Sequence, residues 1–358
     1  MKKHNLIRKL SALAAAGAML FSLAACSGSP ATTPSTGEET LKVAIIKQLD
    51  HASLDEIANA VAARFDEDTA AGTVKVEYEI SSGQNDQTIL KQLCDQAIAD
   101  QVDVIIPIAT TAAQVAALSA EGTGVKVAYA AISDPAAANL TGLDYVTGTS
   151  DALNTGFILD MMLALNPDTA KVGLLYSLSE PNSATPIAEA KAYLDAKGIA
   201  YVEQTANTND EVVAAVAALI AAGVDAVFTP TDNVIMAAEL AIYEDFAKAG
   251  IPHYTGADSF VRNGAFVTCG VNYTDLGRRT AELAEQVARG EAVEEYYLMD
   301  GGIITVNTET AAALGVDYSV FKMCIRDRVP SRSIPSMGTH SRTPSSQSIR
   351  SPVKPVAW

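Results

Sequence analysis

The chain has 358 residues, which is more than one compact core usually organises and enough for two domains. Hydrophobic residues make up 49% of it, so a sizeable core can be buried. The formal net charge is −17; the first 25 residues contribute +4 and residues 322–358 contribute +6, which leaves −27 for the residues between them. A body this acidic repels a phosphate backbone, which excludes nucleic-acid binding as a main role. The 4 scattered cysteines exclude a disulfide framework and a clustered zinc site.

The N-terminal residues are typical of an export signal. Residues 1–25 start with a basic segment and continue with an apolar stretch that is short for a membrane span, so we predict a signal peptide. They run into Leu23-Ala24-Ala25-Cys26, which resembles a bacterial lipobox and implies cleavage before Cys26 and attachment of a lipid to its thiol. Residues 26–40, rich in Ser, Thr and Pro, are then a flexible tether. The alternative is an ordinary secretory signal with a chance cysteine.

The middle of the chain alternates apolar strand-like segments with amphipathic helical ones. The first run predicts, in order, a strand at Leu41–Lys47, a helix at Ser53–Asp68, a strand at Val74–Ile80, a helix at Gln84–Asp100, a strand at Val102–Ile108, a helix at Thr111–Ala120 and a strand at Val125–Ile132. After a boundary near residues 147–150, the second run predicts a helix at Ala152–Leu165, a strand at Val172–Tyr176, a helix at Thr185–Ala196, a strand at Ala200–Gln204, a helix at Asp210–Ala222, a strand at Ala226–Thr229 and a helix at Val234–Ala249. Such alternation predicts an α/β protein of two doubly wound parallel-sheet lobes with a ligand cleft between them.

The first predicted strand lacks the glycine-rich turn of nucleotide-binding proteins. Gln48-Leu49-Asp50-His51-Ala52 follows it without any glycine, which argues against a Rossmann fingerprint and a P-loop there. No nucleophile–base trio or pair of catalytic carboxylates can be assembled from the spacing. We therefore expect no catalytic residues, no cofactor and no metal, and a ligand that binds at the carboxyl ends of the strands.

Polar residues follow the predicted strands at the edge where such a ligand would bind. Thr110, Thr111 and Ser133 could bind a carboxylate with their hydroxyls and with the N–H groups of a helix start, and an unpaired Asp232 could accept from an ammonium. This predicts a cradle for a zwitterion; the alternative is ordinary N-capping of helices. The expected ligand-binding residues are Gln48, His51, Ser82, Thr110, Thr111, Ser133, Asp134, Glu180, Asn182, Thr231, Asp232, Asn233 and Asp258.

Several of these segments together resemble one protein family. They are Ser133-Asp134-Pro135, Val146-Thr147-Gly148-Thr149-Ser150, Ser179-Glu180-Pro181-Asn182-Ser183, Pro230-Thr231-Asp232-Asn233 and Tyr273-Thr274-Asp275-Leu276-Gly277-Arg278. In this order they are similar to the substrate-binding lipoproteins of ABC transporters of the tryptophan/tyrosine type. The resemblance runs from about Leu41 to Val320 and implies a type I periplasmic-binding-protein fold. It further implies two lobes that close on a small solute, an amino acid with an aromatic or branched side chain.

The resemblance also implies how the lobes are divided and where the protein works. The first lobe would contain residues 41–148 plus about 255–290, and the second residues 149–254 plus about 291–321. The implied partners are the solute, an ABC permease and a lipid anchor on the extracytoplasmic face of the cell membrane. The alternatives are a ligand-sensing module for a membrane signalling partner and, less favoured, an extracytoplasmic enzyme.

The C-terminal residues depart from this pattern. Residues 322–358 are rich in Ser, Pro and Arg and show no apolar periodicity, which predicts disorder. Met323-Cys324-Ile325-Arg326-Asp327-Arg328 resembles the translated read-through that ends many metagenomic reading frames, so we expect this tail to be non-native.

Overall fold

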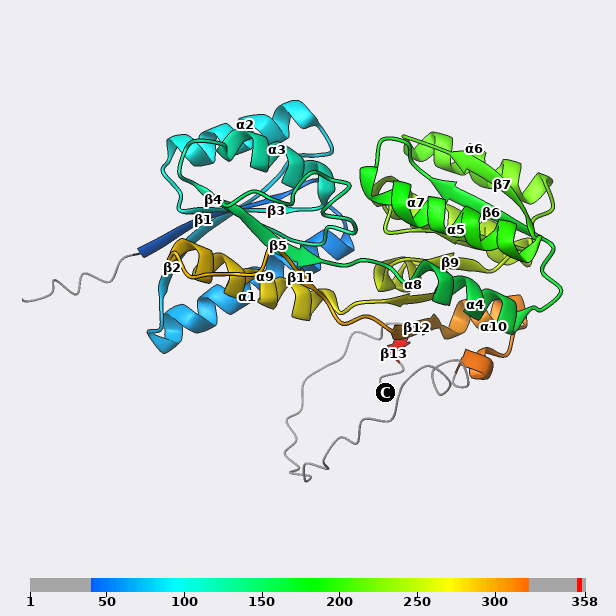
Figure 1. Ribbon diagram of the computed structural model, residues 1–358. Helices are drawn as coiled ribbons and strands as arrows, with labels where there is room; N and C mark the ends of the chain where they lie inside the picture. Colours follow the sequence, from blue (N-terminus) through cyan, green and yellow to red (C-terminus); the bar gives the residue numbers. More distant parts are fainter. Residues whose placement is uncertain (1–39, 322–352, 356–358) are drawn as a thin grey trace, which may run out of the picture. The chain divides into compact units, whose positions relative to one another are not determined.

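The computed structural model describes residues 40–321 and 353–355, and the strands within these residues form two sheets. The first sheet has the strand order β11-β5-β4-β3-β1-β2, and the second has the order β13-β12-β10-β9-β8-β6-β7. Helices cover both faces of each sheet (Figure 1). The prediction of two α/β lobes with parallel sheets is confirmed, because apolar strands buried on both faces need helices on either side.

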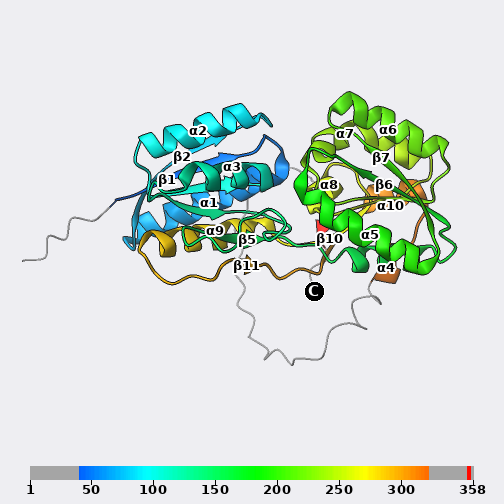
Figure 2. The same ribbon diagram turned by 45° about the horizontal axis from the view of Figure 1, so that its top comes forward.

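The first lobe holds the N-terminal strands and two late elements of the chain. Its elements are β1 (Thr40–Lys47), α1 (Ala52–Ala71), β2 (Lys75–Ser82), α2 (Gln87–Ala99), β3 (Val104–Ile108), α3 (Thr110–Ala120), β4 (Lys126–Tyr129), β5 (Val146–Ser150), α9 (Tyr273–Ala288) and β11 (Tyr297–Leu298). All the pairs in this sheet are parallel. Helices α2 and α3 pack on one face of the sheet, and α1 and α9 lie side by side on the other (Figure 2).

The second lobe repeats the arrangement with a mixed edge. Its elements are α4 (Thr155–Leu165), β6 (Lys171–Tyr176), α5 (Ala184–Lys197), β7 (Ala200–Thr205), α6 (Asn209–Ala221), β8 (Ala226–Thr229), α7 (Asn233–Lys248), β9 (His253–Thr255), α8 (Asp258–Arg262), β10 (Val267–Gly270), β12 (Ile303–Asn307), α10 (Thr308–Leu314) and β13 (Val353–Pro355). Strands β6 to β10 pair in parallel, whereas β12 runs antiparallel to both β10 and β13.

The predicted division between the lobes is wrong at both late crossings. Strands β9 and β10 belong to the second sheet, so the chain returns to the first lobe at α9 and not near residue 255. Strand β11 pairs with β5 of the first sheet, so the last crossing follows Leu298 and not residue 290. Strands of two to four residues carry too few side chains for a pattern, and their sheet is decided by which neighbour they pair with.

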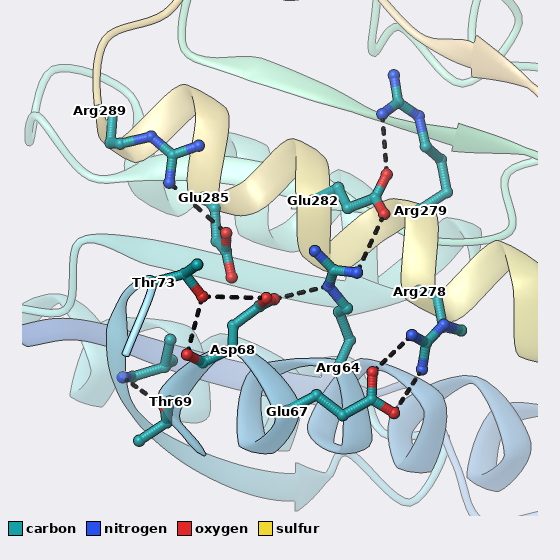
Figure 3. A network of polar contacts seen from close by, with 11 residues as sticks. Arg64, Glu67, Asp68, Thr69, Thr73, Arg278, Arg279, Glu282, Glu285 and Arg289 are labelled. Atoms are coloured by element: carbon teal, nitrogen blue, oxygen red, sulfur yellow. Dashed lines mark hydrogen bonds and ion pairs between the residues drawn. The ribbon is translucent and has the colours of Figure 1, made fainter. Parts of the chain in front are cut away.

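Helix α9 packs closely on α1, and ion pairs join the two helices at the surface (Figure 3). A Cβ atom at Gly277 would lie 2.6 Å from the carbonyl oxygen of Ile57, so the two helices touch where glycine allows it. Around this point Arg278 binds Glu67 through both of its terminal nitrogens, at 3.0 and 2.6 Å. The contact thus fixes a segment from late in the chain onto the N-terminal lobe.

Most of the two ends of the chain lies outside the described residues. The predicted signal peptide, the acylated Cys26 and the tether lie outside the described residues, as does most of the predicted tail. Residues 353–355 of that tail form β13 beside β12, which differs from the disorder predicted for them. Within the described part of the chain, no helix combines the length and apolarity needed to cross a membrane.

Candidate functional site

A buried cavity of about 20 Å³ lies between the carboxyl ends of the strands of the two sheets. The first lobe contributes residues that follow β1, β3, β4 and β5, and the second lobe contributes residues that follow β6, β8 and β9. The lining residues are His51, Ser53, Leu54, Ala109, Thr110, Ala131, Ser133, Asp151, Asn182, Thr231, Asp232, Asn233, Met236, Ala257, Phe260 and Tyr273. This volume holds about one water molecule, so the lobes are closed on each other.

Direct contacts between the lobes keep the cavity small. The hydroxyl of Ser133 lies 3.0 Å from that of Thr231, and Thr185 donates to Asp134 Oδ2 at 2.7 Å. On the other side of the cavity, the hydroxyls of Ser53 and Ser259 bond to each other. A solute of amino-acid size must therefore replace some of these contacts.

Of the two carboxylates that line the cavity, Asp151 has the fewer hydrogen-bond donors. It follows β5 directly, is 3% exposed, and accepts from Ser133 Oγ and Tyr273 Oη, each at 3.0 Å. No Lys or Arg among the described residues pairs with it. Burial without a cation raises its pKa above the ordinary range of an aspartate. A cationic group placed here would restore the charged form.

Two polar atoms aimed at the same cavity have no partner in the described part of the chain. They are the hydroxyl of Thr110, at the first residue of α3, and Oδ1 of Asn182. Beside them the backbone is strained, because Ala109 and Ala131 have φ of +79° and +58° although neither is glycine. Such conformations cost on the order of 1–3 kcal/mol each and persist where the surrounding structure fixes them, commonly at ligand sites.

The remaining wall of the cavity is apolar. Leu54 comes from α1, Met236 from α7 and Phe260 from α8, so both lobes contribute. Phe260 is 1% exposed and presents an aromatic ring beside the polar groups. The lining thus combines polar groups suited to a charged group with apolar side chains suited to a hydrophobic one.

The expectation that Asp232 carries an unpaired carboxylate is wrong. It lines the cavity, but its Oδ1 accepts from Ile235 N at 3.0 Å, and its Oδ2 accepts from Ser177 N and Ser183 Oγ, both at 2.7 Å. All three donors belong to its own lobe. The carboxylate caps α7 and ties two loops together, as the capping alternative supposed.

A chain of four polar side chains crosses between the lobes beside the cavity. Gln48 Nε2 donates to Glu180 Oε1 at 2.8 Å, and Asn233 Nδ2 donates to Glu180 Oε2 at 2.6 Å. His51 Nε2 lies 2.9 Å from Asn233 Oδ1 and its Nδ1 accepts from Ser53 N, which leaves Nε2 as the donor of a neutral imidazole. Burial, and then the neighbouring Asp232, raise the pKa of Glu180 to about 8, while burial lowers the pKa of His51.

The predicted site residues therefore fall into three groups. His51, Thr110, Ser133, Asn182, Thr231, Asp232 and Asn233 line the cavity. Gln48 and Glu180 lie in the polar chain beside it. Ser82, Thr111, Asp134 and Asp258 do not line it: Thr111 N donates to Gln48, and Asp258 pairs with Arg262 at 3.0 Å.

Among the lining residues that escaped the sequence analysis are Asp151, Met236, Phe260 and Tyr273. Asp151 follows β5, a strand that was interpreted as a boundary between the lobes. Had that strand been recognised, the rule that polar residues follow strands would have found it. The other three lie on helices, and nothing in their spacing separates them from ordinary core residues.

Known proteins match most of the chain. A model of the family described as ABC transporter substrate binding protein matches residues 42–321. A tyrosine-binding protein of Clostridioides difficile strain R20291 is 27% identical over 321 residues, which cover 86% of this chain and 92% of that protein.

Among solved structures, the ABC domain of Streptococcus pneumonia in complex with L-Trp is 28% identical, with a TM-score of 0.72 over 79% of this chain and 98% of that chain. The ligand-free, open structure of a substrate binding protein with adhesive properties from Clostridium difficile is 26% identical, with a TM-score of 0.59 over 77% and 95% of the two chains.

Proposed function

Because the chain belongs to the family of ABC transporter substrate-binding proteins, we propose that its solute is an α-amino acid with an aromatic or branched side chain. Proteins of this family work outside the cytoplasm and deliver a small solute to an ABC permease, and so does this chain. The relatives that bind tyrosine and L-Trp support an aromatic amino acid as the first choice.

The observation that carries the proposal is the buried Asp151, which has two hydroxyl donors and no cation among the described residues. The ammonium of an amino acid would supply the missing positive charge, and a charged hydrogen bond in a dry site is strong. The carboxylate of the solute would bind the hydroxyl of Thr110 and the positive end of α3, an 11-residue helix. Its side chain would then lie against Leu54, Met236 and Phe260.

Binding on this arrangement proceeds by movement of the lobes. The solute enters while they are apart, because the closed cavity holds about one water molecule. Contacts from both lobes then give it a higher affinity for the closed form, which is what drives closure. We expect aromatic amino acids to lower the radius of gyration of a solute-free, open population in X-ray scattering.

Calorimetry with matched solutes tests the assignment of the polar groups. We expect L-tyrosine or L-tryptophan to bind, and 3-(4-hydroxyphenyl)propionate, which lacks the ammonium, to bind at least about 30-fold more weakly. Tyrosine amide, which lacks the carboxylate, tests the role of Thr110 and α3 in the same way. Equal affinity for tyrosine and its deaminated analogue would contradict the proposal, and so would the absence of binding to every aromatic or branched amino acid.

We also propose that a lipid on Cys26 holds the protein at the membrane, on the basis of the lipobox-like Leu23-Ala24-Ala25-Cys26. Expression with a labelled fatty acid tests this directly. The label is expected on the wild type and not on Cys26→Ser. A Cys26→Ser protein that still carries the label and stays in the membrane fraction would refute it.

A further inference from the structure

The hydrogen bond between Gln48 and Glu180 joins the two lobes beside the cavity without lining it. Gln48 and Glu180 are 1% and 2% exposed, and neither lines the cavity, yet they join the lobes at 2.8 Å. Gln48 is also fixed from its own lobe, because its Oε1 accepts from Thr111 N and its Nε2 donates to Asn85 Oδ1. The contact therefore needs no solute in order to form.

The closed state that this contact holds has no room for an amino acid, since the cavity volume is about 20 Å³. Lobes closed as tightly as this and a bound solute consequently exclude each other, and closure around a solute must leave the lobes further apart. Any condition that stabilises the contact lowers the apparent affinity, because it reduces the fraction of molecules that can accept the solute.

We propose that Gln48, Glu180, Asn233 and His51 form a proton-sensitive latch that holds the solute-free lobes closed and weakens as the solution becomes alkaline. This proposal rests on the proposed function, because the latch closes over the site of the solute. The carboxylate of Glu180 is its centre, since it accepts from Gln48 across the cleft and from Asn233 within its own lobe.

The charges around the latch determine the direction of its response. Asp232, at the start of α7, repels the charge of Glu180, and no Lys or Arg of the described residues pairs with either carboxylate. His51 is the basic group on the opposite side, bonded through Asn233, and it lies near Lys47, Asp50 and Asp55. Asp232 lies near Glu180 in the same lobe whether the lobes are open or closed. What closing the lobes adds is the burial of Glu180, which favours its neutral form.

Glu180 is the group that makes the latch weaken at alkaline pH. Its pKa in the closed lobes is raised from the ordinary 4.5 to about 8, mainly by burial. The part of this burial that closure causes therefore favours closure at low pH, and that contribution is lost as pH rises through about 8. His51 acts in the opposite sense, because its burial between the closed lobes lowers its pKa from the ordinary 6.5, and its protonation below that pH favours the open lobes. The ratio of closed to open protein should therefore fall by up to roughly tenfold per pH unit between pH 6.5 and 8, and change little just below pH 6.5.

X-ray scattering of the solute-free full chain from pH 5 to 9 tests the latch without any ligand. We expect the radius of gyration to rise between pH 6.5 and 8 in the wild type. Glu180→Gln, which is neutral at every pH, should remove this rise, whereas Glu244→Gln, an exposed glutamate on α7, should keep it. His51→Asn retains a side chain that can cap α1. Because it lacks the imidazole that opposes closure, its closed fraction should keep rising as the pH falls below 6.5.

Calorimetric affinity for L-tyrosine gives a second measure. The latch predicts tighter apparent binding at pH 8 than at pH 6.5 in the wild type, by up to roughly tenfold per pH unit, and a constant, weaker affinity for Glu180→Gln. A wild-type radius of gyration that is flat over this range overturns the latch whether or not an amino acid binds. An affinity of Glu180→Gln that still rises with pH as in the wild type would also overturn it, because Glu180 would then not be the titrating group. If no amino acid binds but the scattering follows the prediction, the result supports the latch and contradicts the proposed solute.

Discussion

The contact between α1 and α9 and the cleft between the lobes both join segments that are far apart in the sequence. They differ in whether their carboxylates are paired with a cation. In the first, carboxylates are paired with arginine: Arg64 Nε lies 2.6 Å from Asp68, and Arg278 and Arg289 pair with Glu67 and Glu285 (Figure 3). In the second, Asp151, Glu180 and Asp232 are buried around one cavity without an ion pair to any described residue.

The difference follows from what each contact has to do. Helix α9 must stay on the first lobe in the open and the closed protein alike, so its charges can be neutralised permanently. The cleft must open, and buried carboxylates without cations make its empty closed state costly. A solute that carries an ammonium, or a proton, removes part of that cost. We therefore expect the cleft to close fully once an ammonium or a proton has bound to these carboxylates.

The largest effect is expected from removing the charge of Asp151. Asp151→Asn should lower the affinity for an aromatic amino acid by about 2–5 kcal/mol, because the ammonium would be buried without an anionic partner. The melting temperature of the solute-free protein should stay the same or rise, since a buried charge is lost. Calorimetry and thermal unfolding measure the two quantities.

Asp232→Asn is the matched control for that change. Its amide nitrogen cannot accept from Ser177 N and Ser183 Oγ, so unfolding should require about 1–3 kcal/mol less free energy while the affinity for the solute stays the same. If the two variants exchange these effects, the assignment of the ammonium to Asp151 fails.

The permanent contact can be broken at Gly277. Gly277→Ala should lower the free energy of unfolding by about 1–3 kcal/mol in chemical denaturation, because the new methyl group would meet Ile57 O and Ala60 Cβ at 2.6 and 2.7 Å. The affinity of the folded fraction should not change. Gly156→Ala on α4 is the control, since its Cβ would have no neighbour within 3.9 Å. Equal stability of the two variants would show that the helices can separate freely.

A smaller effect is expected from Glu285, at the far end of the same contact. Burial, and then the nearby Asp68, raise its pKa from 4.5 to about 7, so its contribution to stability is complete below about pH 4.5 and is lost as pH rises through about 7. Glu285→Gln should remove roughly 1 kcal/mol or less of this pH dependence once solvent screening is considered. Denaturation of both proteins at pH 5 and pH 8 measures it; parallel losses in the two would exclude Glu285 as the source.

The smallest effect is expected from Glu67, whose ion pair with Arg278 lies in solvent. Glu67→Gln should leave the melting temperature at pH 7 unchanged, because water and salt screen an exposed pair. A clear fall in melting temperature at both low and high salt would mean that the surface pairs, and not the close packing at Gly277, hold α9 in place.

The repeated alternation of strands and helices was predictable because its periods are properties of neighbouring residues. Helix α7 was expected at Val234–Ala249 and occurs at Asn233–Lys248, and β1 was expected one residue shorter than it is. The candidate site was predictable in part for the same reason. Thr110, Ser133 and Thr231 follow strands, and the ends of parallel strands meet at one edge.

The roles of individual groups in the site were not predictable in the same way. The sequence shows Asp232 and Asp151 as two acidic residues that follow apolar segments. The first accepts from three donors and the second from two hydroxyls. This difference depends on Ser177 and Ser183, 55 and 49 residues away, for Asp232 and on Tyr273, 122 residues away, for Asp151. Hydrogen bonds between residues so far apart in the chain leave no periodic pattern in the sequence.

By itself, the sequence therefore determined the class of fold, the two lobes and the edge at which a solute would bind, because hydrophobic period and helix capping act over a few residues. Tertiary structure alone decided that β9 and β10 join the second sheet, that β11 joins the first, and that Asp151 is buried with two hydroxyl donors while Asp232 has three donors. Those outcomes depend on which strands find a free hydrogen-bonding edge and which side chains are buried together. Such choices are made between segments that the chain brings together only when it folds.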